Sequence, residues 1–288
     1  MKLYRHWARA DVTRTDAEGR PAVTAAYAGS DRSPEDAQAR ADALAQARAR
    51  WVQDRSGPAD PFGGYGLTDR PLREAVLWRQ DDPAGQPQAA LTRSRNGYVV
   101  LNATQLMIVD VDHLPGPGAG QHVRALWARL RGEPPPAPPT PLDTLLRPFL
   151  RRHPEWSVRA YRTRAGYRLL VTHAPLDARD PTHLRLMGEL RADPLYVRLC
   201  RMQGCYRARL SPKPHRAGMV RPAQAYPYRD DRERAAQQAW EARYAQRAAG
   251  YAAAELVDVY GTGAVHPALA PLVRLHDEQA VQAGRPLA

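Results

Sequence analysis

The 288-residue sequence contains little cysteine, almost no lysine and no long apolar run. Its two cysteines, Cys200 and Cys205, are too few for a disulfide scaffold and favour a reducing compartment. The first residues lack the uninterrupted apolar stretch of a secretory signal, and no segment approaches the length of a membrane span. We therefore expect a cytoplasmic protein with no membrane partner.

Basic residues outnumber acidic ones by 42 to 30, and the pI near 10.1 indicates an anionic partner such as nucleic acid. Only Lys2 and Lys213 are lysine, so codon bias in a GC-rich genome is a competing explanation for the arginine excess. Codon bias should spread that excess evenly along the chain. Instead, 14 basic and four acidic residues lie between positions 158 and 222, a net charge of +10 in less than a quarter of the sequence.

The first 104 residues predict a small α/β module made of a hairpin, a helix and a sheet. Ser33 is a good N-cap, and Pro34 suits the first helical position. Asn96-Gly97 is a strong hairpin signal. The expected elements are strands over 2–13 and 22–28 with a turn at 16–19, a helix over 34–54, a loop over 57–66, and strands over 73–79, 88–92 and 98–102.

Residues 105–222 predict a βαββαβ module of the ferredoxin-like or RRM-like kind. Residues 105–112 are apolar enough for a strand buried on both faces. Residues 223–288 are expected to form a helical tail, so the predicted fold class is α+β. The other expected elements are helices over 121–131 and 142–152 separated by a proline-rich connector at 134–141, strands over 157–163 and 167–172, helices over 181–190 and from 193, and a strand over 205–210.

Asp110 and Asp112 end the most hydrophobic of these strands. Side chains two residues apart on a strand point to the same face, so the two carboxylates repel each other unless a cation or a proton lies between them. Hard oxygen ligands of this kind suit Mg²⁺ or Mn²⁺. The alternative is that both acids merely cap the end of the strand or the following loop.

Two basic stretches follow the acidic pair. In the hairpin beside the acidic strand, Gly166 allows the backbone to approach a phosphate and Arg168 can bind one bidentately, although an ordinary exposed hairpin is the simpler interpretation. Arg207 and Arg209 share one face of the last predicted strand. Lys213 follows them, and a lysine in an arginine-rich chain hints that a compact ammonium group is needed there.

Cysteine and histidine give weaker signals. Cys200 and Cys205 could form half of a zinc site with His215 or His173, but two buried structural thiols is the preferred interpretation because no second cysteine pair exists. We assign no role to His266 or His276.

The acidic pair, the hairpin that follows it and the basic segment that ends at Lys213 occur in this order along the chain. Together they resemble the motifs of the archaeo-eukaryotic primase superfamily, particularly its primase-polymerase branch. The resemblance covers roughly residues 105–217. The family's acidic pair is matched by Asp110 and Asp112, and Arg168 stands where the family usually has a nucleotide-binding histidine. The remaining matches are Thr163 and Gly166 on the hairpin, followed by Asp193, Tyr196, Arg201, Arg207, Ser211 and Lys213.

The resemblance implies template-directed nucleotidyl transfer on DNA or RNA with nucleoside triphosphates. Asp110, Asp112 and Asp193 would be the catalytic residues and would hold two Mg²⁺ or Mn²⁺ ions. Two alternatives stay open: a non-catalytic nucleic-acid-binding protein with a primase-like fold, and a divalent-metal nuclease that uses the same carboxylates. The implied nucleotide- and phosphate-binding residues are Thr163, Gly166, Arg168, Arg207, Arg209, Ser211 and Lys213.

Overall fold

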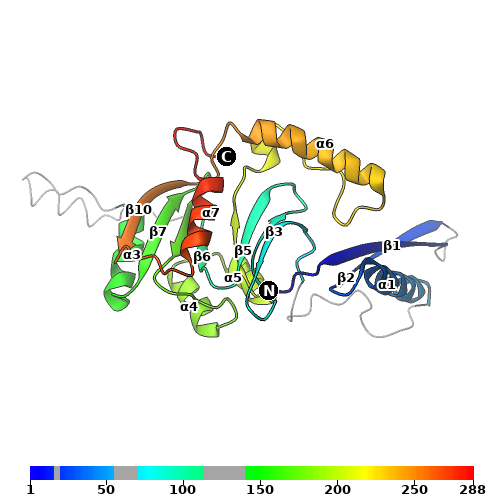
Figure 1. Cartoon of the computed structure of the whole chain (residues 1–288), viewed down its shortest axis with the longest axis horizontal. Helices are drawn as coiled ribbons and strands as arrows, with labels where there is room; N and C mark the ends of the chain where they lie inside the picture. The colour runs from blue at the N-terminus through cyan, green and yellow to red at the C-terminus, as the bar shows by residue number, and fades with distance from the viewer. Residues whose placement is uncertain (16–19, 55–70, 113–139) are drawn as a thin grey trace, which may run out of the picture. The chain divides into compact units, whose positions relative to one another are not determined.

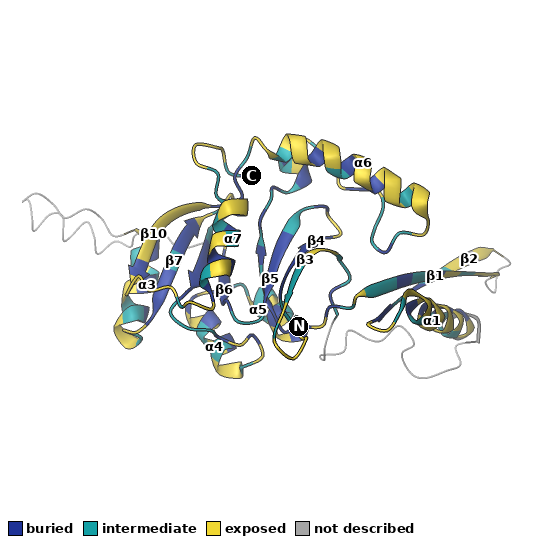
Figure 2. Cartoon of the chain, viewed as in Figure 1, coloured by how far each residue is buried: buried dark blue, intermediate teal, exposed yellow. Residues whose placement is uncertain are grey.

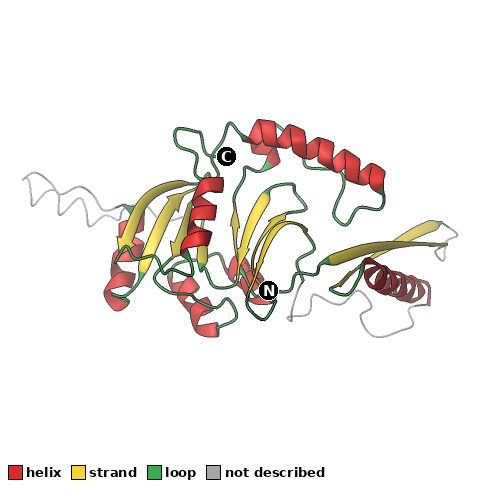
Figure 3. Ribbon diagram, viewed as in Figure 1, coloured by secondary structure: helices red, strands yellow, loops and turns green. Residues whose placement is uncertain are grey.

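The computed structural model describes residues 1–15, 20–54, 71–112 and 140–288, and the chain divides into two compact units. Among the described residues there are six α-helices and three antiparallel sheets, which confirms the predicted α+β class (Figure 3). The units do not follow the three successive segments that we expected, because the chain leaves unit 1 and later returns to it. Unit 1 comprises Met1–Val100, Met202–Gly204 and Lys213–Ala249, and unit 2 comprises Leu101–Arg201, Cys205–Pro212 and Gly250–Ala288.

Unit 1 begins with an antiparallel hairpin covered by a helix (Figure 1). Strands β1 (His6–Thr15) and β2 (Pro21–Ser30) pair along their whole length, and α1 (Pro34–Asp54) packs on them. The Ser33 hydroxyl accepts a hydrogen bond from the Asp36 backbone N–H at 3.2 Å, as expected of an N-cap. Small side chains let the helix approach the strands closely; the buried contact consists of Ala8, Ala10, Ala26, Ala37, Ala41 and Ala45.

A second part of unit 1 surrounds the turn between β4 (Pro87–Arg93) and β5 (Val99–Ala103). Strand β3 (Ala75–Asp81) pairs with β4 in the same sheet. The predicted Asn96-Gly97 turn is present as a three-residue loop, with Ser94 and Tyr98 bonded through their backbones. Gly97 has φ +95° and lies under the Trp240 ring of α6 (Asp231–Ala248). The Trp240 indole N–H donates to the Val220 carbonyl at 3.1 Å, beyond the short 3₁₀ helix η1 (Pro214–Ala217).

Unit 2 is built on a four-stranded antiparallel sheet in the order β10-β7-β8-β6. Its inner strands are largely buried and β10 is largely exposed, as the colours of Figure 2 show. The α3 helix starts at a capping box formed by Thr140 and Asp143. The strands are β6 (Ile108–Val111), β7 (Ser157–Arg162), β8 (Tyr167–Val171) and β10 (Glu255–Gly261), and the helices are α3 (Pro141–Arg152), α4 (Pro181–Glu189), α5 (Pro194–Gln203) and α7 (Ala270–Ala280).

One expectation for this region was wrong, and a second was incomplete. The expected fourth strand of the βαββαβ module, β9 (Tyr206–Arg209), pairs with β5 in the order β3-β4-β5-β9 and does not join the sheet of β6. The Tyr196 hydroxyl bonds to the Ile108 carbonyl and to the Arg207 backbone, each at 3.0 Å, and so occupies backbone groups that a direct β6–β9 ladder would use. The expected helical tail does contain two helices, α6 and α7, but it also contains β10, whose valine-rich residues pair with β7.

Several predictions fall on residues that the structure does not describe: the turn at 16–19, the loop at 57–66, the helix at 121–131 and most of the connector at 134–141. Within the described ranges, no helix combines the length and the apolar character needed to cross a membrane.

We predict that Gly97→Ala lowers the free energy of unfolding by about 2–4 kcal/mol, through left-handed backbone strain and overpacking. A Cβ at this position would lie 2.2 Å from the Trp240 ring. Gly85→Ala is the matched control, because Gly85 has φ +75° but no atom within 4 Å of its added Cβ. Urea denaturation should show the larger loss for Gly97→Ala; equal losses would contradict the packing contribution.

Candidate functional site

The register of the unit 2 sheet places three polar side chains side by side. Asp110 of β6 is directly opposite Arg168 of β8, which is directly opposite Tyr161 of β7. Directly opposed residues on antiparallel strands share one face of a sheet. His276 and Asp277 of α7 contact this face. We call the following six residues the charged row: Asp110, Arg159, Tyr161, Arg168, His276 and Asp277.

Arg168 is the buried centre of the charged row, with a side chain that is only 3% exposed. Its Nε donates to Asp110 Oδ1 at 3.0 Å, and its Nη1 donates to the Arg209 carbonyl at 2.8 Å. A buried guanidinium needs charge neutralisation and hydrogen-bond acceptors; Asp110 supplies the opposite charge, and the Arg209 carbonyl supplies a second acceptor. Arg168 therefore serves the interior of unit 2, and its burial does not fit the predicted role of binding a triphosphate.

His276 continues the charged row from α7 and is fully buried. Arg168 Nη1 lies 3.4 Å from His276 Nε2, and because a guanidinium can only donate, Nε2 is the acceptor. The imidazole proton is therefore on Nδ1, which donates to Asp277 Oδ1 at 2.9 Å. Burial lowers the pKa of His276 below its ordinary value.

Asp277 accepts hydrogen bonds from several members of the charged row. It accepts from the Tyr161 hydroxyl at 2.6 Å and from Arg159 Nη2 at 2.7 Å. Burial by itself raises the pKa of Asp277, but the hydrogen bonds from His276 and Tyr161 outweigh it and the pKa is lowered. Sequence reasoning missed this part of the site, although the adjacent His276-Asp277 pair was a usable signal.

The three predicted metal ligands do not converge. Asp193 caps α5, because its Oδ1 accepts the Tyr196 backbone N–H at 2.9 Å, and only its own backbone N–H approaches the Asp110 carbonyl, at 3.4 Å. Asp112 is exposed one residue beyond β6. Over the described ranges, no three carboxylate, histidine or cysteine side chains form a group that could hold a metal ion.

The donor set in unit 2 therefore does not fit the two divalent ions that the primase resemblance implies. One oxygen of Asp110 is engaged by a guanidinium, and the Asp193 carboxylate is engaged by a helix N-terminus. Divalent ions of this class need several free oxygen ligands within about 2–2.6 Å. We assign no chemical step to this cluster.

The predicted phosphate-binding residues are divided between the two units. A Cβ at Gly166 would lie 2.1 Å from the Val111 carbonyl, so this glycine lets the hairpin turn reach the end of β6 rather than a ligand. Thr163 closes the same turn through its backbone N–H. Arg209 is half-buried and donates to the Ser211 carbonyl at 2.8 Å, Arg207 is half-buried in β9, and Lys213 belongs to unit 1.

Both cysteines are free and buried. Burial raises the pKa of the Cys200 thiol to about 12, so it is protonated at neutral pH. The preferred interpretation of two buried thiols agrees with this environment.

Unit 1 contains an open groove beside η1 and the β4–β5 turn, with a volume of about 580 Å³. None of the described residues that line it is acidic. We call it the Lys213 groove; it is lined by Asn96, Tyr98, Lys213, Pro214, His215, Met219, Val220 and Arg221.

No protein-family model matches this chain, and no curated protein or solved structure is significantly similar to it. Any assignment of function therefore depends on the residues and the geometry described above.

We predict that stability falls as the pH is lowered from 7.5 to 5.5. The folded pKa of His276 is below its ordinary value of 6.5, so below that value the unfolded chain binds more protons than the folded chain. Urea denaturation at several pH values should show this slope, and His276→Gln should reduce it, leaving the part contributed by His173, whose pKa burial also lowers. His215→Gln, at an exposed position, is the control and should keep the wild-type slope; an unchanged slope in His276→Gln would refute the assignment.

Proposed function

We propose that this chain is a nucleic-acid-binding protein that binds an extended, single-stranded segment in the Lys213 groove. The observation that carries the proposal is the groove itself, whose described lining combines cationic, aromatic and apolar side chains and includes no acidic one. Single-strand binding sites combine a positively charged groove along the phosphates with aromatic faces on which bases stack.

Each component of such a site has a candidate residue in the groove. Arg221 is exposed and has no partner among the described residues, and Lys213 and His215 add further positive or ionisable groups. Tyr98 offers an aromatic face, and Val220 is 81% exposed, so apolar surface is available to a base. The ligand class follows from these groups, since phosphates require cations and unstacked bases require flat apolar partners.

The geometry of unit 2 supports a non-catalytic role. Of the three carboxylates that metal-dependent nucleotidyl transfer or nuclease chemistry would use, Asp110 is engaged by Arg168 and Asp193 by the start of α5, whereas Asp112 is exposed. Those contacts stabilise the fold and leave no three-ligand cluster among the described residues. Of the functions compatible with a basic chain, binding therefore needs the fewest additional assumptions.

We expect wild-type protein to bind a fluorescent 20-nucleotide strand of DNA or RNA with an affinity that falls as salt rises. Arg221→Ala and Lys213→Ala should each weaken binding and flatten the slope of log K against log salt by about 0.7 per lost phosphate contact. Fluorescence anisotropy across a salt series measures both quantities.

The matched control is Arg274→Ala, which removes an exposed arginine from α7 in unit 2. It changes the net charge by the same amount but should leave the salt slope unchanged. Equal losses in Arg274→Ala and Arg221→Ala would show general charge attraction instead of a groove, and salt-independent binding would contradict the proposal.

A second candidate, nucleotidyl transfer of the primase-polymerase type, is favoured by one observation. Asp110, Arg168, Asp193 and Arg209 come from three separate motif segments, yet they contact one another through side chains or backbone in unit 2. This convergence agrees with the motif resemblance, although the ligand geometry does not fit the metal ions.

Incubation with Mg²⁺ or Mn²⁺, a primed template and nucleoside triphosphates separates the candidates, and a labelled strand without nucleotides tests the nuclease alternative. We predict neither incorporation nor cleavage. Metal-dependent activity that is lost in Asp112→Asn but retained in Asp258→Asn would replace the binding proposal with an enzymatic one. Asp112 and Asp258 are both exposed, so neither substitution removes a partner of Arg168.

A further inference from the structure

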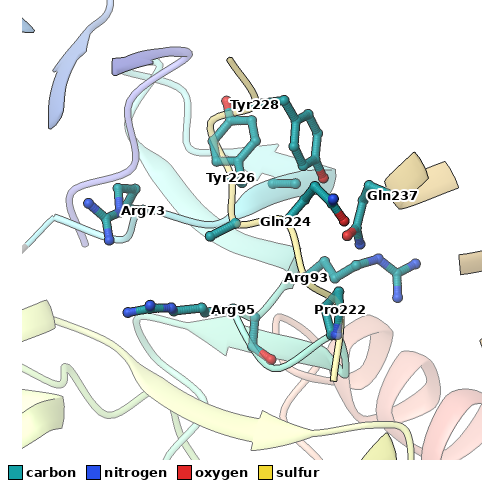
Figure 4. Close-up of a pocket in the computed structure, with 11 residues that line it drawn as sticks. Arg73, Arg93, Arg95, Pro222, Gln224, Tyr226, Tyr228 and Gln237 are labelled. Atoms are coloured by element: carbon teal, nitrogen blue, oxygen red, sulfur yellow. The ribbon is translucent and has the colours of Figure 1, made fainter. Parts of the chain in front are cut away.

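A second, narrower pocket in unit 1 is formed by the β4–β5 turn and the segment that leads into α6 (Figure 4). Figure 4 shows Tyr226 and Tyr228 on one side of it, with Arg73 and Arg95 extending along another. Its enclosed volume is about 20 Å³, which is room for one small polar group. We call it the Gln237 pocket.

Two buried oxygens in this pocket have no hydrogen-bond partner in the described part of the chain. They are Ser94 Oγ and Gln237 Oε1, on residues that are 9% and 3% exposed. An unpaired buried polar atom costs free energy that a bound group recovers when it supplies the missing hydrogen bond. The pocket is therefore chemically incomplete.

The orientation of the Gln237 amide determines what kind of group completes it. Gln237 Nε2 donates to Glu241 Oε1 at 2.9 Å, which leaves Oε1 as an acceptor in the pocket. A matching ligand must therefore present an N–H or O–H group to this oxygen. The Ser94 hydroxyl can donate to a neighbouring acceptor on the same ligand.

The arginines around the pocket divide into paired and available groups. Arg93 Nε lies 2.9 Å from Glu241 Oε1 and Nη1 donates to the Gly97 carbonyl, so the charge of Arg93 is matched, although its Nε makes no hydrogen bond within the described residues. The Arg73 guanidinium lies 3.6 Å from the Tyr27 ring centroid. Arg95 is exposed and has no partner among the described residues, so its guanidinium can bind an anion.

We infer that the Gln237 pocket holds the amino edge of one unstacked base of the bound strand, an inference that rests on the proposed nucleic-acid binding. The exocyclic amine donates to Gln237 Oε1, and the adjacent ring nitrogen accepts from Ser94 Oγ. Tyr226 and Tyr228 are half-buried and border the pocket, where a base can contact their rings, while Arg95 contacts a flanking phosphate.

This arrangement discriminates between pyrimidines. Cytosine carries an amine at the position where thymine and uracil carry a carbonyl oxygen. A carbonyl at that position would face the acceptor Oε1 of Gln237, so neither the carbonyl oxygen of the base nor Gln237 Oε1 would have a donor. The strand site should therefore prefer cytosine over thymine or uracil.

Fluorescence anisotropy at pH 7.5 with 12-nucleotide oligo-dC and oligo-dT tests the preference, and oligo-rC and oligo-rU repeat it for RNA. We expect wild-type protein to bind oligo-dC about 5- to 10-fold more tightly, the effect of one well-placed hydrogen bond. Gln237→Leu should lower oligo-dC affinity to the oligo-dT level and leave oligo-dT affinity unchanged. Ser94→Ala should also lower oligo-dC affinity alone.

Gln246→Leu is the matched control, because Gln246 is an exposed glutamine on the same helix. It should keep the cytosine preference, and thermal melting verifies that each variant is folded. Equal, salt-sensitive binding of both oligonucleotides by wild type would overturn the base-edge inference and leave the nucleic-acid proposal standing. No binding of any strand would overturn both.

Discussion

The buried guanidinium of Arg168 imposes the strongest constraint on unit 2, because a charge in this position must be neutralised and fully hydrogen-bonded. Asp110 supplies the opposite charge from β6, and the Arg209 carbonyl of β9 and His276 of α7 supply further acceptors. His276 must in turn remain neutral, and Asp277 holds its proton on Nδ1. A charge buried in one strand thus determines the positions of segments that are far apart in sequence.

This constraint changes the meaning of the acidic pattern. In the sequence, an aspartate at the end of an apolar strand has the pattern of a metal ligand. In the structure, Asp110 is the counter-ion of Arg168 on β8, the neighbouring strand of the sheet. The polar groups of the proposed ligand site lie in unit 1, around the β4–β5 turn and the segment from Lys213 to Tyr228. The proposed ligand site and the buried ion pair therefore lie in different units of the chain.

Local signals predicted the elements well. Ser33 and Pro34 marked the start of α1, and Asn96-Gly97 marked the turn between β4 and β5, because capping and turn conformation depend on neighbouring residues. The pairing of β9 with β5 and the presence of β10 were not predicted. Strand pairing joins distant segments, and here a tyrosine hydroxyl determines which backbone groups are available.

The sequence alone determined the α+β class, most element positions and the concentration of basic charge. It also determined that Arg168 lies on the hairpin beside the Asp110 strand. Only the tertiary structure decided that Arg168 is buried, that Asp193 caps a helix, and that Ser94 and Gln237 share a pocket. Composition and periodicity reflect backbone preferences and average burial. Ligand geometry depends on which side chains meet across distant segments, and packing determines that.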